Sequence, residues 1–190
     1  MTLYKNKYRI ETTRVRGWDY RNAGFYFVTL CTQDRRSTFG DIHAGLVHLS
    51  TLGEIAHQYW VEIPAHHQGI ALDEFVIMPN HMHGILCINH TAVETLHATS
   101  LPPHDISKRN PAMSNISPRS GSIGAIIRSY KSAVTNWARR HGHRDFVWQT
   151  RYFEHIIRNE ESFQRIRQYI LENPLNWESD QENPANRSSL

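Results

Sequence analysis

The chain has 190 residues, of which 39% are hydrophobic and 11% aromatic, which suffices for one domain with a buried core and excludes wholesale disorder. Lysine and arginine number 21 and acidic residues 18, and the net charge of +3 is a modest bias toward nucleic acid. Cys31 and Cys87 lie in apolar runs without metal-site or disulfide spacing, and the lack of a signal peptide or membrane span leads us to expect a cytoplasmic protein with no membrane partner.

Residues 1–22 form a basic and aromatic arm, in which arginines alternate with tyrosine and tryptophan. Guanidinium groups pair with phosphates and aromatic rings stack on bases, so the arm is a candidate contact for a single strand. An arm whose aromatic residues pack on the domain is an equally good interpretation. The arginines that we single out here are Arg14 and Arg16.

The next elements are predicted to alternate between strands and a helix. Residues 24–33 form a strand rich in β-branched and aromatic residues, and residues 39–49 a weaker extended segment. A helix begins at Ser50 or Thr51, with Glu54 placed for a capping box, and ends before Pro64. Residues 66–67 follow in a loop, and residues 70–78 and 81–88 form an antiparallel pair of strands.

The second half of the chain begins with a change of composition. Residues 89–122 are rich in Ser, Pro, Asn and Thr, which predicts a mobile insertion. Residues 123–140 carry one apolar stripe and a basic face, typical of a helix. Residues 146–149 and 152–157 are extended, residues 160–172 are a helix capped near Asn159, and residues 178–190 form a polar, frayed tail. The main domain therefore covers residues 23–177.

This order of elements predicts an α+β fold. Several strands, with helices available to cover one face, form a sandwich with a mainly antiparallel sheet. A ferredoxin-like arrangement satisfies the order.

Two histidines mark the first candidate site. His81 and His83 are two residues apart in a predicted strand, so both side chains leave the same face, where they can hold a divalent metal ion. A pair of this kind can also be structural or incidental in a chain with 13 histidines.

The end of the last helix offers a third ligand and a nucleophile. Tyr169 and Asn173 are four residues apart and therefore share a helical face. An amide oxygen from Asn173 suits a hard cation such as Mg²⁺ or Mn²⁺, and Tyr169 could attack a phosphate polarised by that ion. Tyr130, on the basic helix, is the rival nucleophile, and Tyr152 is a third choice. In isolation, Tyr169 and Asn173 could simply pack and end the helix.

Three blocks of sequence together resemble a known family. They are MPNHMHG at 78–84, WQTRYFEHIIR at 148–158 and YILENP at 169–174. In this order they resemble the single-tyrosine HUH transposases, which are IS200-like, and most closely the REP-associated tyrosine transposases. The resemblance extends from residue 24 to residue 177, with residues 89–122 as an insertion.

The resemblance implies a ferredoxin-like HUH nuclease domain that cuts and rejoins single-stranded DNA near a hairpin. By motif position, His81, His83 and Asn173 would hold the divalent ion, and Tyr169 would form a covalent 5′-phosphotyrosine. Members of the family include monomers and homodimers, and some process repeated palindromes instead of mobilising their own gene.

Two other functions remain open. A catalytically silent nucleic-acid-binding regulator would keep the fold, although it would be expected to have lost a ligand or the tyrosine. A hydrolase of small phosphoesters would use water, with Tyr169 structural. For a DNA enzyme or regulator, we expect contacts to DNA from six basic residues: Arg14, Arg16, Arg128, Lys131, Arg151 and Arg158.

Overall fold

A computed structural model describes residues 15, 17–89, 120–180 and 182–187. Its central feature is a four-stranded sheet with the spatial order β4-β5-β1-β6, in which all neighbours are antiparallel. The strands are β1 (Gly24–Cys31), β4 (Ile70–Ile77), β5 (His81–Ile88) and β6 (Phe153–Ile157). Helix α1 (Thr51–Val61) connects β1 to β4, and α4 (Ile123–Arg140) connects β5 to β6. This is the predicted ferredoxin-like α+β fold with an antiparallel sheet, which is confirmed.

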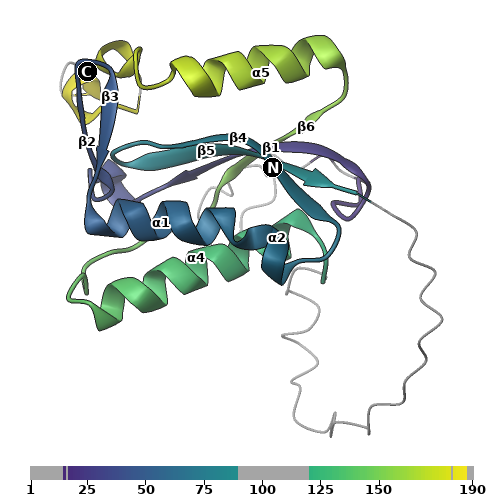
Figure 1. The fold of residues 1–190 in the computed structure, drawn as a ribbon, viewed down its shortest axis with the longest axis horizontal. Helices are drawn as coiled ribbons and strands as arrows, with labels where there is room; N and C mark the ends of the chain where they lie inside the picture. The colour runs from purple at the N-terminus through teal and green to yellow at the C-terminus, as the bar shows by residue number, and fades with distance from the viewer. Residues whose placement is uncertain (1–14, 16, 90–119, 181, 188–190) are drawn as a thin grey trace, which may run out of the picture.

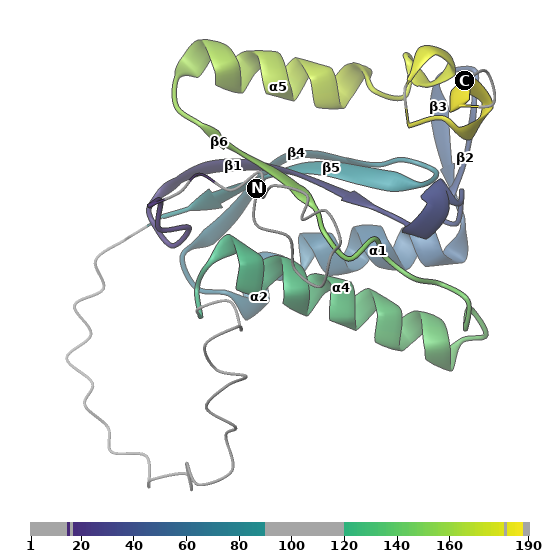
Figure 2. The ribbon, with the colours of Figure 1, turned by 180° about the vertical axis from the view of Figure 1, so that it is seen from behind.

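Helices α1 and α4 cover one face of the sheet (Figures 1 and 2). Their apolar stripes and the strand residues facing them form the main core, with Trp60 fully buried at its centre. Ser50 caps α1, as predicted, and its hydroxyl accepts a hydrogen bond from the Gly53 amide at 3.1 Å. Glu54 is one residue too late for a capping box with Ser50. A short helix, α2 (Ile63–His66), follows, so His66 ends a helix where a loop was expected.

Helix α5 (Glu160–Glu172) lies on the opposite face of the sheet (Figures 1 and 2). Its bounds and its Asn159 cap agree with the prediction, and the Asn159 side chain accepts from the Ser162 amide at 2.8 Å. The expectation that the helices cover one face holds for α1 and α4 but is wrong for α5. The reason is a second, smaller core, because Phe27 and Ile85 on this face are apolar and pack against Ile170.

Three predicted extended segments differ in the structure. The segment at 39–49 is a hairpin of β2 (Gly40–His43) and β3 (Leu46–Leu49). The first strand ends at Cys31, and the 3-10 turn η1 (Gln33–Arg35) follows it. Between 146 and 152, Trp148 forms an isolated bridge with Thr32, just beyond the end of β1. Regular pairing of this segment therefore starts with β6.

The C-terminal residues 178–180 and 182–187 are folded back, so the expectation of a frayed tail is wrong for them. They include part of the 3-10 turn η3 (Trp177–Ser179) and the turn η4 (Pro184–Arg187). Asparagine side chains satisfy the turn carbonyls: Asn183 donates to Trp177 O at 3.0 Å and Asn186 to Glu178 O at 2.8 Å. The tail thus supplies partners for its own backbone.

The described part of the N-terminal arm packs on the domain. Trp18 donates from Nε1 to the Tyr26 hydroxyl at 3.2 Å, and Tyr20 is part of the main core. Residues 1–14 and 16, and residues 90–119 of the predicted insertion, lie outside the described residues. In the part of the chain that is described, no helix is both long and apolar enough to cross a membrane.

Candidate active site

Strand β5 carries both predicted histidines on the face that α5 covers. His81 lies opposite Cys31 and His83 opposite Thr29 on β1, and both imidazoles are buried. The two Nε2 atoms face each other at 3.1 Å. The alternation of a strand therefore brings the pair together as the sequence predicts.

Asn80 determines the tautomer of His81. The Asn80 amide nitrogen donates to the carbonyls of Arg35 at 3.1 Å and Glu182 at 2.7 Å, so its oxygen faces His81 Nδ1 at 2.8 Å. His81 Nδ1 consequently carries the proton, and its Nε2 presents a lone pair.

His83 is held from the other side by Thr29, whose Oγ1 lies 2.8 Å from His83 Nδ1. If Thr29 accepts this bond, the Nε2 atoms of His81 and His83 both present lone pairs to the space between them. Two lone pairs at this distance repel each other, and only a proton or a cation between them removes the repulsion. Burial, first of all, lowers the pKa of both histidines and keeps them neutral at pH 7.

Helix α5 brings Tyr169 to the histidines. Its hydroxyl lies 3.2 Å from His83 Nε2, and its ring meets Phe27 edge-on at 6.2 Å between centroids. Tyr169 is 47% exposed, so part of its side chain is open to a ligand. The pKa of Tyr169 is raised, first by burial and then by the Asp180 carboxylate, and a hydrogen bond from Asn173 offsets part of this rise.

Asn173 follows α5 and is only 2% exposed. Its Oδ1 is buried without a hydrogen-bond partner among the described residues. In the same part of the chain, no three His, Cys, Asp or Glu side chains are grouped to hold a metal ion. A divalent cation held by His81 and His83 would therefore need a donor of another type, which the orphaned Asn173 oxygen supplies.

The rival tyrosines lie away from the histidines. The Tyr130 hydroxyl is buried in the main core, on the other face of the sheet, where it donates to Ala56 O at 2.9 Å. Burial raises the pKa of Tyr130 far above its usual value. Tyr152 lines a groove beside α4. Among these tyrosines, only Tyr169 combines access with contact to a histidine.

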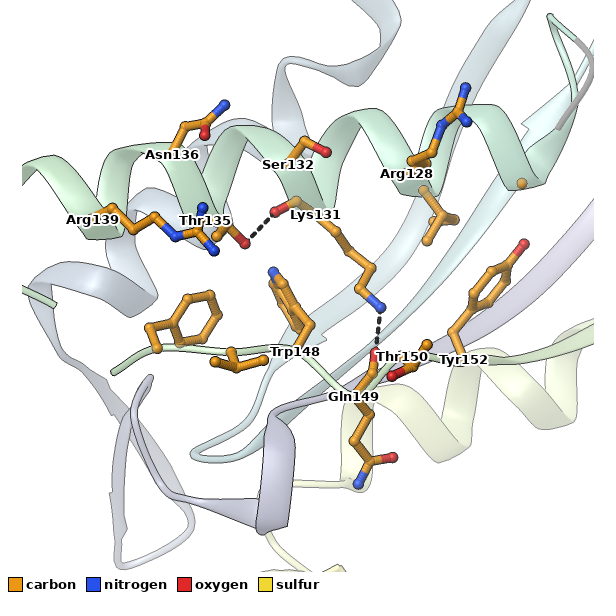
Figure 3. Close-up of a pocket in the computed structure, with 14 residues that line it drawn as sticks. Arg128, Lys131, Ser132, Thr135, Asn136, Arg139, Trp148, Gln149, Thr150 and Tyr152 are labelled. Carbon is orange, nitrogen blue, oxygen red and sulfur yellow. Dashed lines mark hydrogen bonds between the residues drawn. The ribbon is translucent and has the colours of Figure 1, made fainter. Parts of the chain in front are cut away.

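Arg128 and Lys131 line a groove of about 610 Å³ between α4 and residues 146–152 (Figure 3). Lys131 Nζ donates to Gln149 O at 2.5 Å and lies over the Trp148 ring at 5.9 Å from its centroid. Burial lowers the pKa of Lys131 to about 8. Because α4 and α5 cover opposite faces, the structure does not bring this groove together with the histidines and Tyr169.

The other predicted DNA contacts are divided between two places. Arg151 and Arg158 are exposed and flank β6. Arg14 and Arg16 lie outside the described residues.

Comparison with known proteins finds a relative that is similar over most of the chain. The chain is 39% identical over 177 residues to an uncharacterized protein of Haemophilus influenzae, in a match that covers 90% of this chain and 91% of that protein. The chain belongs to that protein's family. No protein-family model matches the sequence.

The fold is similar to that of a solved structure. The structure of a REP-associated tyrosine transposase bound to a REP hairpin matches with a TM-score of 0.54 and 21% identity, and the match covers 87% of this chain and 74% of that one. The chain has the fold of this transposase, as the three sequence blocks indicated.

Within this transposase fold, sequence reasoning missed Asn80, Thr29 and Phe27. Asn80 looked like part of a turn, although an asparagine directly before a histidine pair can orient it. Thr29 is a polar residue in an apolar strand, which was the available signal. Phe27 stacks on His83 with 5.4 Å between ring centroids, and nothing in the sequence distinguishes it from other core residues.

Proposed function

We propose that this protein is a single-stranded DNA endonuclease and strand transferase that acts near hairpins through a covalent bond to Tyr169. The observation that carries the proposal is the half-exposed Tyr169, whose hydroxyl lies 3.2 Å from His83 Nε2, beside the paired imidazoles. A tyrosine packed only for stability would not need these neighbours. The likeness in fold to a transposase bound to a hairpin supports the same substrate class.

We also propose that a divalent cation, Mg²⁺ or Mn²⁺, is held by His81, His83 and Asn173. The facing imidazole nitrogens and the orphaned Asn173 oxygen fit such an ion. When bound, the ion withdraws charge from a phosphate oxygen and stabilises the charge that develops in the transition state.

The chain's own residues have separate roles in this reaction. The Tyr169 oxygen attacks the phosphorus, a bond forms between them, and the bond from phosphorus to the 3′ oxygen breaks. The phenol loses one proton and the departing 3′ oxygen gains one, so the step is balanced. Asn173 favours the phenolate by donating to it, and Phe27 keeps the Tyr169 ring beside His83. The 5′-phosphotyrosine preserves the energy of the broken bond for rejoining.

The groove beside α4 is proposed as a second contact to DNA. Arg128 and Lys131 offer positive charge there, and Arg139 lines the same groove (Figure 3). Cations of this kind bind phosphates without reading sequence. The groove would hold DNA on the face opposite Tyr169.

The decisive experiment uses labelled hairpin oligonucleotides from the DNA flanking the gene, with Mg²⁺ or Mn²⁺ and a denaturing gel. We expect a protein-DNA adduct that Tyr169→Phe abolishes. Tyr130→Phe is the matched control, because it removes a hydroxyl on the other face of the sheet, and it should keep the adduct. Treatment with a chelator should abolish adduct formation by the unaltered protein.

Two results would change the proposal. An adduct lost in Tyr130→Phe and kept in Tyr169→Phe would reject the nucleophile. DNA binding without an adduct for any flanking hairpin would favour the silent regulator.

A further inference from the structure

Helix α5 leaves one side of the candidate site open. Arg167 of α5 pairs with Asp73 at 2.9 Å and Glu74 at 3.0 Å, and both of these residues belong to β4. These contacts hold the helix toward the β4 side of the sheet. The opposite edge strand, β6, is covered near its end at Ile157 but not at its first residue, Phe153, which is 46% exposed.

Phe153 lies in the same row of the sheet as His83. Both residues are register partners of Thr29, one from each side, so all three side chains project from the face that carries the site. His83 and Phe153 are thus two strand spacings apart, about 10 Å. Phe27 connects them, since its ring meets Phe153 at 6.2 Å and His83 at 5.4 Å between centroids.

The surroundings of Phe153 suit a nucleic acid strand. His155 is exposed on the same face, and the exposed Arg151 and Arg158 flank the strand. An exposed apolar ring on a strand with an exposed imidazole and a cationic residue beyond each end lacks the wide apolar area of a protein interface. It combines instead a stacking surface for a base with positive charge for the phosphates on either side.

We propose that Phe153 is the stacking platform for an unpaired base next to the phosphate that is cut, and that the DNA strand reaches Tyr169 across the β6 edge. The proposal rests on the proposed function, because it uses the position of Tyr169. It adds the direction of approach and a binding residue for the substrate. The ligand class is an unpaired nucleobase in single-stranded DNA.

The first test is photocrosslinking of the Tyr169→Phe variant, which leaves the DNA uncut. The probes are hairpin oligonucleotides with single-stranded flanks, each with one photoreactive iodouracil at a different flank position. We expect the peptide that contains Phe153 to be crosslinked from one or two adjacent positions. Crosslinks from the flanks only to other peptides would overturn the proposal.

The second test compares Phe153→Leu with Phe25→Leu. Both changes remove an exposed phenylalanine ring from the same face while keeping an apolar side chain, but Phe25 packs on Phe163 away from His83. Phe153→Leu should weaken binding of the hairpin oligonucleotide at least about tenfold, about 1.4 kcal/mol, without changing the salt dependence of binding. Phe25→Leu should bind as the parent does. Phe153→Trp should restore binding.

The outcomes separate this inference from the proposed function. An adduct formed equally well by the parent and by Phe153→Leu, with equal affinity, would reject the role of Phe153 and keep the enzyme. Absence of any adduct together with a crosslink at Phe153 would reject the chemistry and keep the stacking site.

Discussion

Asn80 determines which nitrogen of His81 faces the second histidine. The Asn80 side-chain NH₂ group donates to two backbone carbonyls, and its oxygen accepts from one imidazole. The amide therefore cannot rotate without losing a buried hydrogen bond. Thr29 has the same role for His83, because its Oγ1 lies 2.8 Å from His83 Nδ1. These neutral residues orient the imidazoles, and the proposed metal site depends on that orientation because each imidazole offers one lone pair.

Lys131 supplies a pH-dependent test of the groove. Burial lowers its pKa from the ordinary value of 10.5 to about 8, so the side chain is charged at neutral pH and loses its proton as the pH rises through that value. The slope of log K against log salt for single-stranded DNA should therefore become shallower, by about 0.7, between about pH 7 and about pH 9.5. Binding titrations at several salt concentrations measure it.

Two variants control this prediction. Lys131→Gln should show the shallow slope at both pH values, because no charge remains to be lost. Arg128→Gln should lower the slope at both values and keep the change with pH, since arginine stays protonated throughout. If the slope of log K against log salt for the parent protein does not change with pH, Lys131 does not contact phosphate.

The same lysine affects stability in a defined direction. Its folded pKa lies below its ordinary value, so between about 8 and 10.5 the unfolded chain holds more protons than the folded one. The contribution of Lys131 to stability thus rises with pH across this window, whereas its expected contribution to DNA binding falls.

Among the elements, β5 joins the two cores, with histidines on one face and Gly84 toward the other. A Cβ atom at Gly84 would lie 2.5 Å from Trp60 Cζ2 and 3.2 Å from Phe75 Cβ. Glycine thus allows α1 to approach the strand that carries the site. We expect Gly84→Ala to lower the free energy of unfolding by about 1–3 kcal/mol through overpacking, measured by urea denaturation.

A double-mutant cycle identifies the cause. In a Trp60→Phe background the larger ring is absent, so Gly84→Ala should cost less, with a coupling of at least about 0.5 kcal/mol. Strictly additive effects of the two changes would show that contact with Trp60 is not the reason for the glycine.

For the whole molecule, local patterns predicted the bounds of the helices better than the face of the sheet that each helix covers. The stripe on residues 123–140 and the Asn159 cap give α4 and α5 correct bounds, because helix periodicity and capping are local. The side of the sheet that α5 covers depends on a second core formed by distant residues, which no local pattern reports. The four predicted site residues lie together, whereas Asn80 gains its role only through Arg35 and Glu182, far away in sequence.

Within this chain, the Tyr169 hydroxyl lies 3.2 Å from His83 Nε2, so we expect the tyrosine to act in the site of its own chain. This arrangement predicts that the adduct formed per molecule stays constant on dilution. Mixing the Tyr169→Phe and His83→Gln variants should restore no adduct, because neither chain carries both the tyrosine and the histidine of the site. Recovery of adduct in the mixture would show instead that the tyrosine acts in a partner's site.

In the proposed reaction, having Tyr169 as the nucleophile also limits how many DNA ends a molecule can hold. Each copy would store a single 5′ end as an ester, and Tyr169 would become free only when a hydroxyl group takes that end over. A reaction that joins two cut strands therefore has to proceed one end at a time in a single copy, or to recruit a second copy with a tyrosine of its own.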